Sequence, residues 1–158
     1  MGIAAYCVKG HLIGSITVPH RMSQRMRFAE DEASKIQRFP SFCTECGSQV
    51  HERCRACSSR IPFGAKYCGG CGCALPWTEL ALSAARALTD ETATNLTADE
   101  RSSLKSTFED LTVDSPQTPL AVSRFQKLLA KAGAELRRML PDIIASVATE
   151  TVKKQLGL

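Results

Sequence analysis

The chain has 158 residues, eight cysteines and a formal net charge of +4 at neutral pH. Eight cysteines in so short a chain would suit a secreted disulfide framework, but the first residues lack a basic segment followed by an apolar one. No apolar run approaches the roughly 20 residues that a membrane helix needs. We therefore expect a cytoplasmic protein without a membrane segment, whose reduced thiols bind metal.

The positive charge is confined to one half of the chain. Residues 1–78 carry ten Lys or Arg and five Asp or Glu, whereas residues 79–158 carry ten and eleven. Metal ligation would reduce this charge further, because four thiolates around one Zn²⁺ sum to about −2. The composition therefore permits a nucleic-acid partner without requiring one.

The first predicted element is a β-hairpin over residues 3–18, where short apolar runs flank a turn at Gly10. Cys7 and His11 belong to this turn, and a Cys-x3-His pair offers two metal ligands close in sequence. Taken alone, a buried free cysteine and a surface histidine would be the commoner interpretation. The three CxxC pairs downstream need a fourth pair to complete two sites of four ligands, and this favours the ligand interpretation.

A helical insertion is predicted near residues 21–38, where three arginines precede three acidic residues. Apolar residues recur in this stretch at helical spacing. Its arginine-rich start could contact phosphate, but a solvated helix face between two metal-binding turns is the simpler interpretation.

Residues 43–73 hold the other seven cysteines, and six of these form three CxxC pairs. A CxxC turn directs two thiolates at one point, so two such turns can complete a tetrahedral zinc site. With the hairpin pair, the chain offers eight ligands for two Zn²⁺ ions: Cys7, His11, Cys43, Cys46, Cys54, Cys57, Cys68 and Cys71.

The pairing of these turns is left open by their spacing. The ten residues between Cys57 and Cys68 are typical of a zinc ribbon and favour sequential pairing, whereas a crossed arrangement, as in RING domains, would use the same ligands. His51 lies between two turns and is expected at the surface. Cys73 is interpreted as a spare thiol, or as a substitute if Cys71 is lost.

The cysteine-rich region closes with Trp77, the only tryptophan of the chain. A small zinc module needs a large ring to cover its core, so we expect Trp77 to pack there; stacking on a nucleic-acid base is the alternative. We therefore divide the chain into a double zinc-binding, ribbon-like domain, residues 1–78, and a helical hairpin or bundle, residues 79–158. The predicted fold class is α+β.

Four helices are predicted in the second region. Thr97 and Glu100 form a capping box for the second helix, and the third runs from a cap at Thr118 until Pro141 breaks or kinks it. These long apolar faces predict self-association or a protein partner. The expected apolar positions are Leu80, Ala84, Ala87, Leu88; Leu104, Phe108, Leu111; Ala121, Phe125, Leu128, Ala132, Leu136, Leu140; and Ile144, Ala148, Val152, Leu156.

The ordered set of motifs resembles an uncharacterised bacterial zinc-ribbon family, domain of unknown function 2321. The resemblance covers chiefly the N-terminal half and supports the ligand assignment, including His11. It implies no activity. The matching segments are YCVKGH, FCTECG, the pair Cys54 and Cys57, YCGGCG, and Pro76-Trp77-Thr78.

We expect a non-enzymatic zinc-binding adaptor in which structural zinc presents a protein-interaction surface. A shell of four protein ligands leaves the metal no open position for a substrate. A nucleic-acid-binding zinc-ribbon protein is the alternative, since arginines surround the turns. A zinc-dependent enzyme is a minor alternative, because Glu45, His51 and Glu52 are the only nearby candidates for a base and no catalytic constellation stands out.

Overall fold

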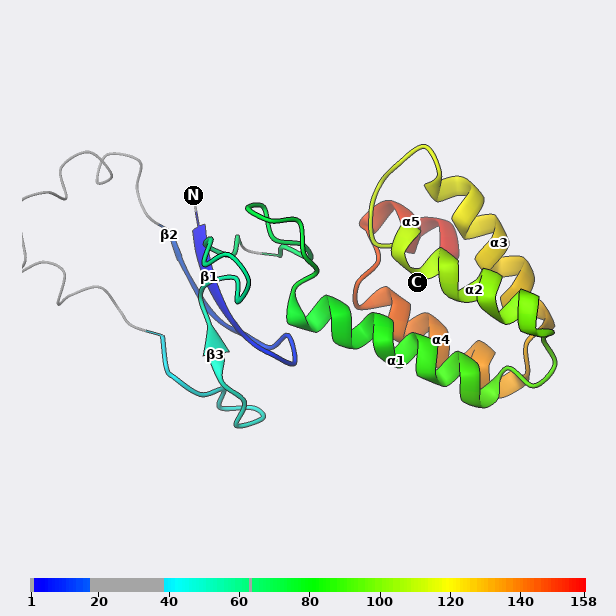
Figure 1. Ribbon diagram of the computed structural model, residues 1–158, viewed down its shortest axis with the longest axis horizontal. Coiled ribbons are helices and arrows are strands. Elements are labelled where there is room, and N and C mark those ends of the chain that lie inside the picture. Colours follow the sequence, from blue (N-terminus) through cyan, green and yellow to red (C-terminus); the bar gives the residue numbers. More distant parts are fainter. Residues whose placement is uncertain (1, 18–38, 63) are drawn as a thin grey trace, which may run out of the picture. The chain divides into compact units, whose positions relative to one another are not determined.

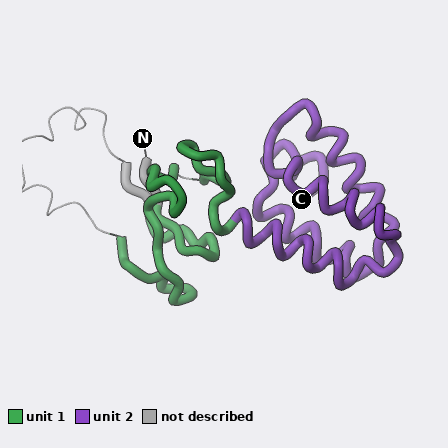
Figure 2. Tube along the Cα trace, viewed as in Figure 1, with its two compact units in different colours: residues 1–77 green, residues 78–158 purple. Residues whose placement is uncertain are grey.

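The computed structural model describes residues 2–17, 39–62 and 64–158 (Figure 1). They form a three-stranded antiparallel sheet with cysteine-rich turns, followed by five helices, which confirms the predicted α+β class. The chain divides into two compact units (Figure 2), which we call the cysteine-rich unit, Met1–Trp77, and the helical unit, Thr78–Leu158.

The sheet of the cysteine-rich unit is built on β1, Gly2–Cys7, which lies between β2, Leu12–Thr17, and β3, Val50–His51. β1 and β2 form the predicted hairpin, and Gly10 in its turn has φ 86°. A left-handed φ of this kind favours glycine, which has no Cβ to clash. The hairpin turn is therefore encoded by the glycine that the sequence places there.

The core of this unit is small. Its buried side chains other than cysteine include Tyr6, Ile61 and Leu75, and Trp77 packs against them. The rings of Tyr6 and Trp77 have centroids 4.5 Å apart, and Trp77 Nε1 donates a hydrogen bond of 3.1 Å to the carbonyl of Ala65. The predicted core role of Trp77 is thus confirmed.

The helical unit has one apolar core, in which α3 packs against α2, α4 and α5. Phe108 of α2 and Phe125 of α3 meet edge to face at its centre, with ring centroids 6.4 Å apart and planes at 70°. The helices are α1, Pro76–Thr92; α2, Ala98–Asp110; α3, Thr118–Lys131; α4, Ala134–Ala145; and α5, Glu150–Leu156.

The buried face of α1 differs from the prediction. Leu80 is 50% exposed, and the face that enters the core carries Thr78, Leu82, Ala85 and Thr89. The hydroxyl of Thr89 donates to the carbonyl of Ala85 at 2.8 Å. Because this bond satisfies the hydroxyl inside the helix, a threonine can be buried at little cost. A stripe of apolar residues alone therefore does not identify the buried face of α1.

The predicted caps are right in one case and wrong in the other. The amide of Glu100 donates to Thr97 Oγ1 at 3.2 Å and the amide of Thr97 to Glu100 Oε2 at 3.1 Å, so the capping box is confirmed. Thr118 is instead the first residue of α3, with Gln117 as N-cap. Its hydroxyl accepts the amide of Ser115 at 2.9 Å and so closes the preceding turn.

The long third helix and the last helix of the prediction are wrong in their boundaries. Extended backbone at Ala132 and Gly133 separates α3 from α4, because glycine is a poor helix former. Thr149 starts α5, since its hydroxyl accepts the amide of Val152 at 3.2 Å. Pro141 lies inside α4, where the burial of Leu140 and Ile144, both 0% exposed, outweighs its helix penalty of roughly 3 kcal/mol.

The helical insertion predicted near residues 21–38 lies outside the described residues. Within them, no helix combines the length and the apolar character that crossing a bilayer requires.

Candidate metal centres

Each CxxC pair lies in a turn of the same construction, over residues 42–49, 53–60 and 67–74. The amide of the first cysteine donates to the carbonyl of the sixth residue, counted from that cysteine, at 2.8 to 2.9 Å. The amide of the fifth residue donates back to the carbonyl of the first cysteine, again at 2.8 to 2.9 Å. A bridge between the flanking residues closes the turn. The fifth residues have positive φ: Gly47 at 68°, Ser58 at 59° and Gly72 at 73°.

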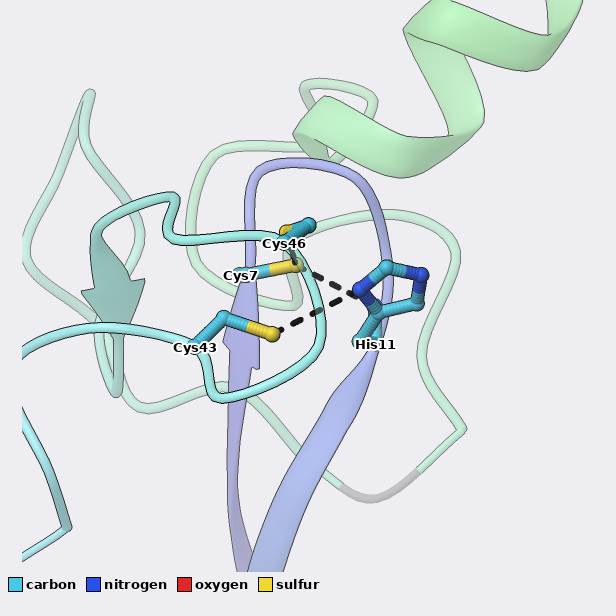
Figure 3. Close-up of side chains that lie close together, drawn as sticks. All are labelled: Cys7, His11, Cys43 and Cys46. Carbon is cyan, nitrogen blue, oxygen red and sulfur yellow. Dashed lines mark hydrogen bonds between the residues drawn. The ribbon is translucent and has the colours of Figure 1, made fainter.

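Site 1 joins the hairpin pair to the first of these turns. Cys7 ends β1, and β3, which follows the turn, pairs with the end of β1 and so brings Cys43 and Cys46 to the hairpin. The Sγ atoms of Cys7 and Cys46 are 3.7 Å apart, and Cys43 Sγ lies 3.5 Å from His11 Nδ1. All four donor atoms lie within 4.8 Å of one another (Figure 3).

These separations fit a zinc tetrahedron. With Zn–S of about 2.3 Å and Zn–N of about 2.0–2.1 Å, two sulfur corners are about 3.8 Å apart and a sulfur and a nitrogen about 3.6 Å. The observed 3.7 Å and 3.5 Å are close to both values. The amide of His11 also donates to Cys7 Sγ at 3.4 Å.

Site 2 joins the second and third turns. Cys54 Sγ lies 3.8 Å from Cys71 Sγ, Cys57 Sγ lies 3.4 Å from Cys68 Sγ, and the four sulfurs are within 4.8 Å of one another. The two groups therefore follow the sequential pairing and not the crossed one. Gly70 allows the two turns to approach, because a Cβ at this position would collide with the hydroxyl of Ser59.

Two other candidate residues lie beside these groups. Cys73 Sγ is 3.2 Å from Cys71 Sγ and 3.5 Å from Cys54 Sγ, so site 2 has a fifth thiol at its edge. His51, expected at the surface, is half-buried on β3 and belongs to neither group. Burial, followed by the charge of Arg55, lowers the pKa of His51.

Hydrogen bonds from the turns favour thiolate at several positions. The hydroxyl and amide of Ser48 lower the pKa of Cys46 to about 6. Backbone amides, that of Cys57 first, lower the pKa of Cys54 to about 6, and Ser59 lowers that of Cys57. The CxxC motif alone does not predict a role for Ser48 and Ser59, although both occupy the sixth position of a turn and the repeated Cys-x2-Cys-x-Ser spacing signals them.

Other thiols in the same site are shifted the opposite way. Backbone amides, that of Gly70 for Cys68 and that of Cys73 for Cys71, act to lower their pKa values, but burial and the neighbouring sulfurs outweigh them and raise both to about 11. Four crowded thiols cannot all ionise on their own, because each thiolate opposes the next. A dication removes this conflict, so both groups have the donor chemistry of a metal centre that binds metal with release of protons.

Comparison with known proteins places the chain in a family. The family described as "Uncharacterized protein conserved in bacteria (DUF2321)" matches residues 2–156, and the chain therefore belongs to it. The predicted resemblance is confirmed and extends over the helical half as well. No curated protein and no solved structure matches the chain. Because the family description carries no activity, the function has to be argued from the two sites.

Proposed function

We propose that this member of the bacterial family is a non-enzymatic zinc protein, in which two structural Zn²⁺ ions hold the cysteine-rich unit in shape for a protein partner. The observation that carries the proposal is that each donor group is complete: three cysteines and a histidine in site 1, and four cysteines in site 2. Four protein ligands leave no position for water or substrate, so such a metal stabilises a fold and does not catalyse.

Zinc suits these donors better than other common divalent metals. Soft thiolate and imidazole donors with tetrahedral separations favour zinc, or iron in an all-cysteine site, over magnesium, calcium or manganese. All eight cysteines are free of disulfides in the structure. Reduced thiols of this number are what we expect of a protein that acts in the reducing cytoplasm.

The proposed docking surface lies beside site 1. Leu12 is 47% exposed and Phe42 is 64% exposed, and each is the sequence neighbour of a site 1 donor, His11 and Cys43 respectively. Because those two donor atoms are only 3.5 Å apart, one metal ion would hold both neighbouring backbones in place. Exposed large apolar side chains on a rigid scaffold are the usual anchors of protein interfaces.

The helical unit offers a second route to association. Its predicted stripes are largely buried against one another, but Leu80, Leu120 and Met139 remain 50%, 47% and 38% exposed. Self-association through these side chains would be weaker than through whole stripes, since less apolar area is left to bury. Sedimentation at micromolar concentration tests this directly.

The zinc proposal is tested by metal analysis of the purified full chain. We expect two zinc ions per chain, and one in a C43S/C46S variant, because that variant retains site 2 intact. A chain purified under zinc-replete conditions with no bound metal would refute the proposal. Iron in site 2 would keep the structural role but change the metal.

The docking proposal needs a variant that leaves the metal in place. L12S/F42S should keep two zinc ions per chain and lose the protein that the unchanged chain retains from a bacterial extract. V113S removes an exposed apolar side chain, 40% exposed, that belongs to neither proposed association surface and is the matched control. Equal retention by all three chains would refute a docking surface at Leu12 and Phe42.

A second candidate, nucleic-acid binding, is favoured by one observation. Arg53 and Arg60 face each other across the bridge that closes the second turn, and both are exposed, as is Arg55. Like charges directly opposite on paired strands repel, and a phosphate between them would relieve the repulsion. Anisotropy of labelled RNA and DNA across a salt series tests this, with R53Q/R60Q expected to reduce the slope of log K against log salt by about 2 for duplex DNA. No binding at low salt would exclude it.

A further inference from the structure

The third turn departs from the other two at one position. The sixth residue is Ser48 in the first turn and Ser59 in the second, but Cys73 in the third. In each turn the side chain of this residue contacts the sulfur of the second cysteine of its own pair. A thiol therefore occupies a position beside a metal donor where the chain elsewhere uses a hydroxyl.

The sulfur of Cys73 lies along one particular edge of site 2. It is 3.5 Å from Cys54 Sγ and 3.2 Å from Cys71 Sγ, which are themselves 3.8 Å apart. Corners of a ZnS4 tetrahedron are about 3.8 Å apart, so Cys73 is already near corner distance from Cys54. Cys71 is exposed and Cys73 half-exposed, whereas Cys54 is buried.

We propose that Cys73 is a fifth ligand of site 2, which exchanges with Cys71 for the fourth position on the metal. This inference rests on the proposed zinc function. In the exchange the Zn–S bond to Cys71 breaks as that to Cys73 forms, and the proton of the Cys73 thiol passes to Cys71 through solvent. Four thiolates stay on the ion throughout, so the charge of the site does not change. Cys54, Cys57 and Cys68 hold the metal in both states.

The exchange is specific to one corner, and this gives a matched control. Cys57 is also an exposed ligand of site 2, but the sixth residue of its own turn is Ser59, a poor zinc ligand. We expect Cys73 to replace Cys71, because the two share a turn and their sulfurs are 3.2 Å apart. We do not expect it to replace Cys57, whose own turn offers only the hydroxyl of Ser59.

Zinc counted by native mass spectrometry on the full chain tests this. We expect two ions per chain in the unchanged protein, C71S and C73S, and one ion in C57S and C71S/C73S. A C71S variant that holds one ion, as C57S does, would overturn the exchange. Two ions in C71S/C73S would overturn it as well, since site 2 would then need neither thiol. If the unchanged protein holds no zinc, the proposed function itself has failed, and that result is distinct.

Alkylation of the unchanged, zinc-loaded protein gives a second measurement that needs no variant to fold. Iodoacetamide modifies a thiol that is off the metal faster than one that is bound to it. Exchange predicts one modified cysteine per chain at early times, divided between Cys71 and Cys73 when the sites are mapped by peptide mass. Modification confined to Cys73 would show a fixed set of four ligands and overturn the proposal.

Discussion

Removal of zinc should unfold the cysteine-rich unit and leave the helical unit folded. Among the described residues of the cysteine-rich unit other than its cysteines, three large side chains are buried, Tyr6, Ile61 and Leu75. At about 1.5–3 kcal/mol each, they contribute about 5–9 kcal/mol. A structural zinc site supplies about 10–16 kcal/mol of apparent binding free energy, so two sites supply about 20–32 kcal/mol. The metal contribution is several times larger than that of the core, and the unit should not fold without it.

The single tryptophan makes the assay simple. Trp77 packs on Tyr6 and donates to the carbonyl of Ala65, so its emission reports on the cysteine-rich unit. Titration with a strong zinc chelator should shift this emission to the red, while the far-ultraviolet circular dichroism at 222 nm, which reports chiefly on the helices, is retained. Added zinc should restore the emission, whereas magnesium should not, because thiolates bind it poorly.

Two results would refute this reasoning. If the emission of Trp77 stays unchanged once metal analysis shows the zinc is gone, the core is sufficient and the ions are not structural. If the helical signal is lost together with the emission, the helical unit depends on the metal, although its core is apolar and the described metal groups lie in the other unit.

Three other perturbations probe the rest of the fold. Phe108→Ala should destabilise the helical unit by about 3–5 kcal/mol in urea unfolding, because the ring is fully buried; a loss below about 1 kcal/mol would mean that the core repacks. Gly10→Ala combines a φ of 86° with a Cβ placed 2.7 Å from Trp77 Cβ, whereas Gly47→Ala has a φ of 68° and an empty surrounding. Gly10→Ala should therefore lower the zinc affinity or thermal stability more, and equal losses would show that the close approach is unimportant. The ammonium of Lys131, and then the backbone amide of Thr97, hold the pKa of Glu100 below its ordinary value. Its stabilising effect is complete above the ordinary pKa and is lost as the pH falls through the lowered one, so Glu100→Gln should flatten the acid-side fall in melting temperature; parallel profiles would contradict this.

The N-terminal half was predicted well because its signals are local. A CxxC pair places two donors within four residues. Gly10 and Gly47 mark turns in the sequence, because the chain there has a positive φ that glycine adopts easily. The capping box at Thr97 and the buried Leu104 and Phe108 were correct for the same reason, since cap and stripe both act within a few turns of one helix.

The helix boundaries after Thr118 were poorly predicted because their signals conflict. The apolar residues from Ala121 to Leu140 keep a helical period across Gly133, although the chain turns there. Periodicity reports which residues face a core, and it does so equally well for one helix or for two helices that share the core. Pro141 shows the same limit, since tertiary packing holds it inside α4 against its local preference.

The sequence by itself therefore indicated a cysteine-rich half and a helical half, the eight candidate donors and the residues of most helical stripes, because each depends on residue type and short spacing. Only the tertiary structure decided which turns share a site, because β3 beside β1 brings Cys43 to His11 across 32 residues of sequence. It also decided the place of Cys73 at the edge of site 2, since the distance to Cys54 depends on how two turns meet at Gly70 and on no property of either turn alone.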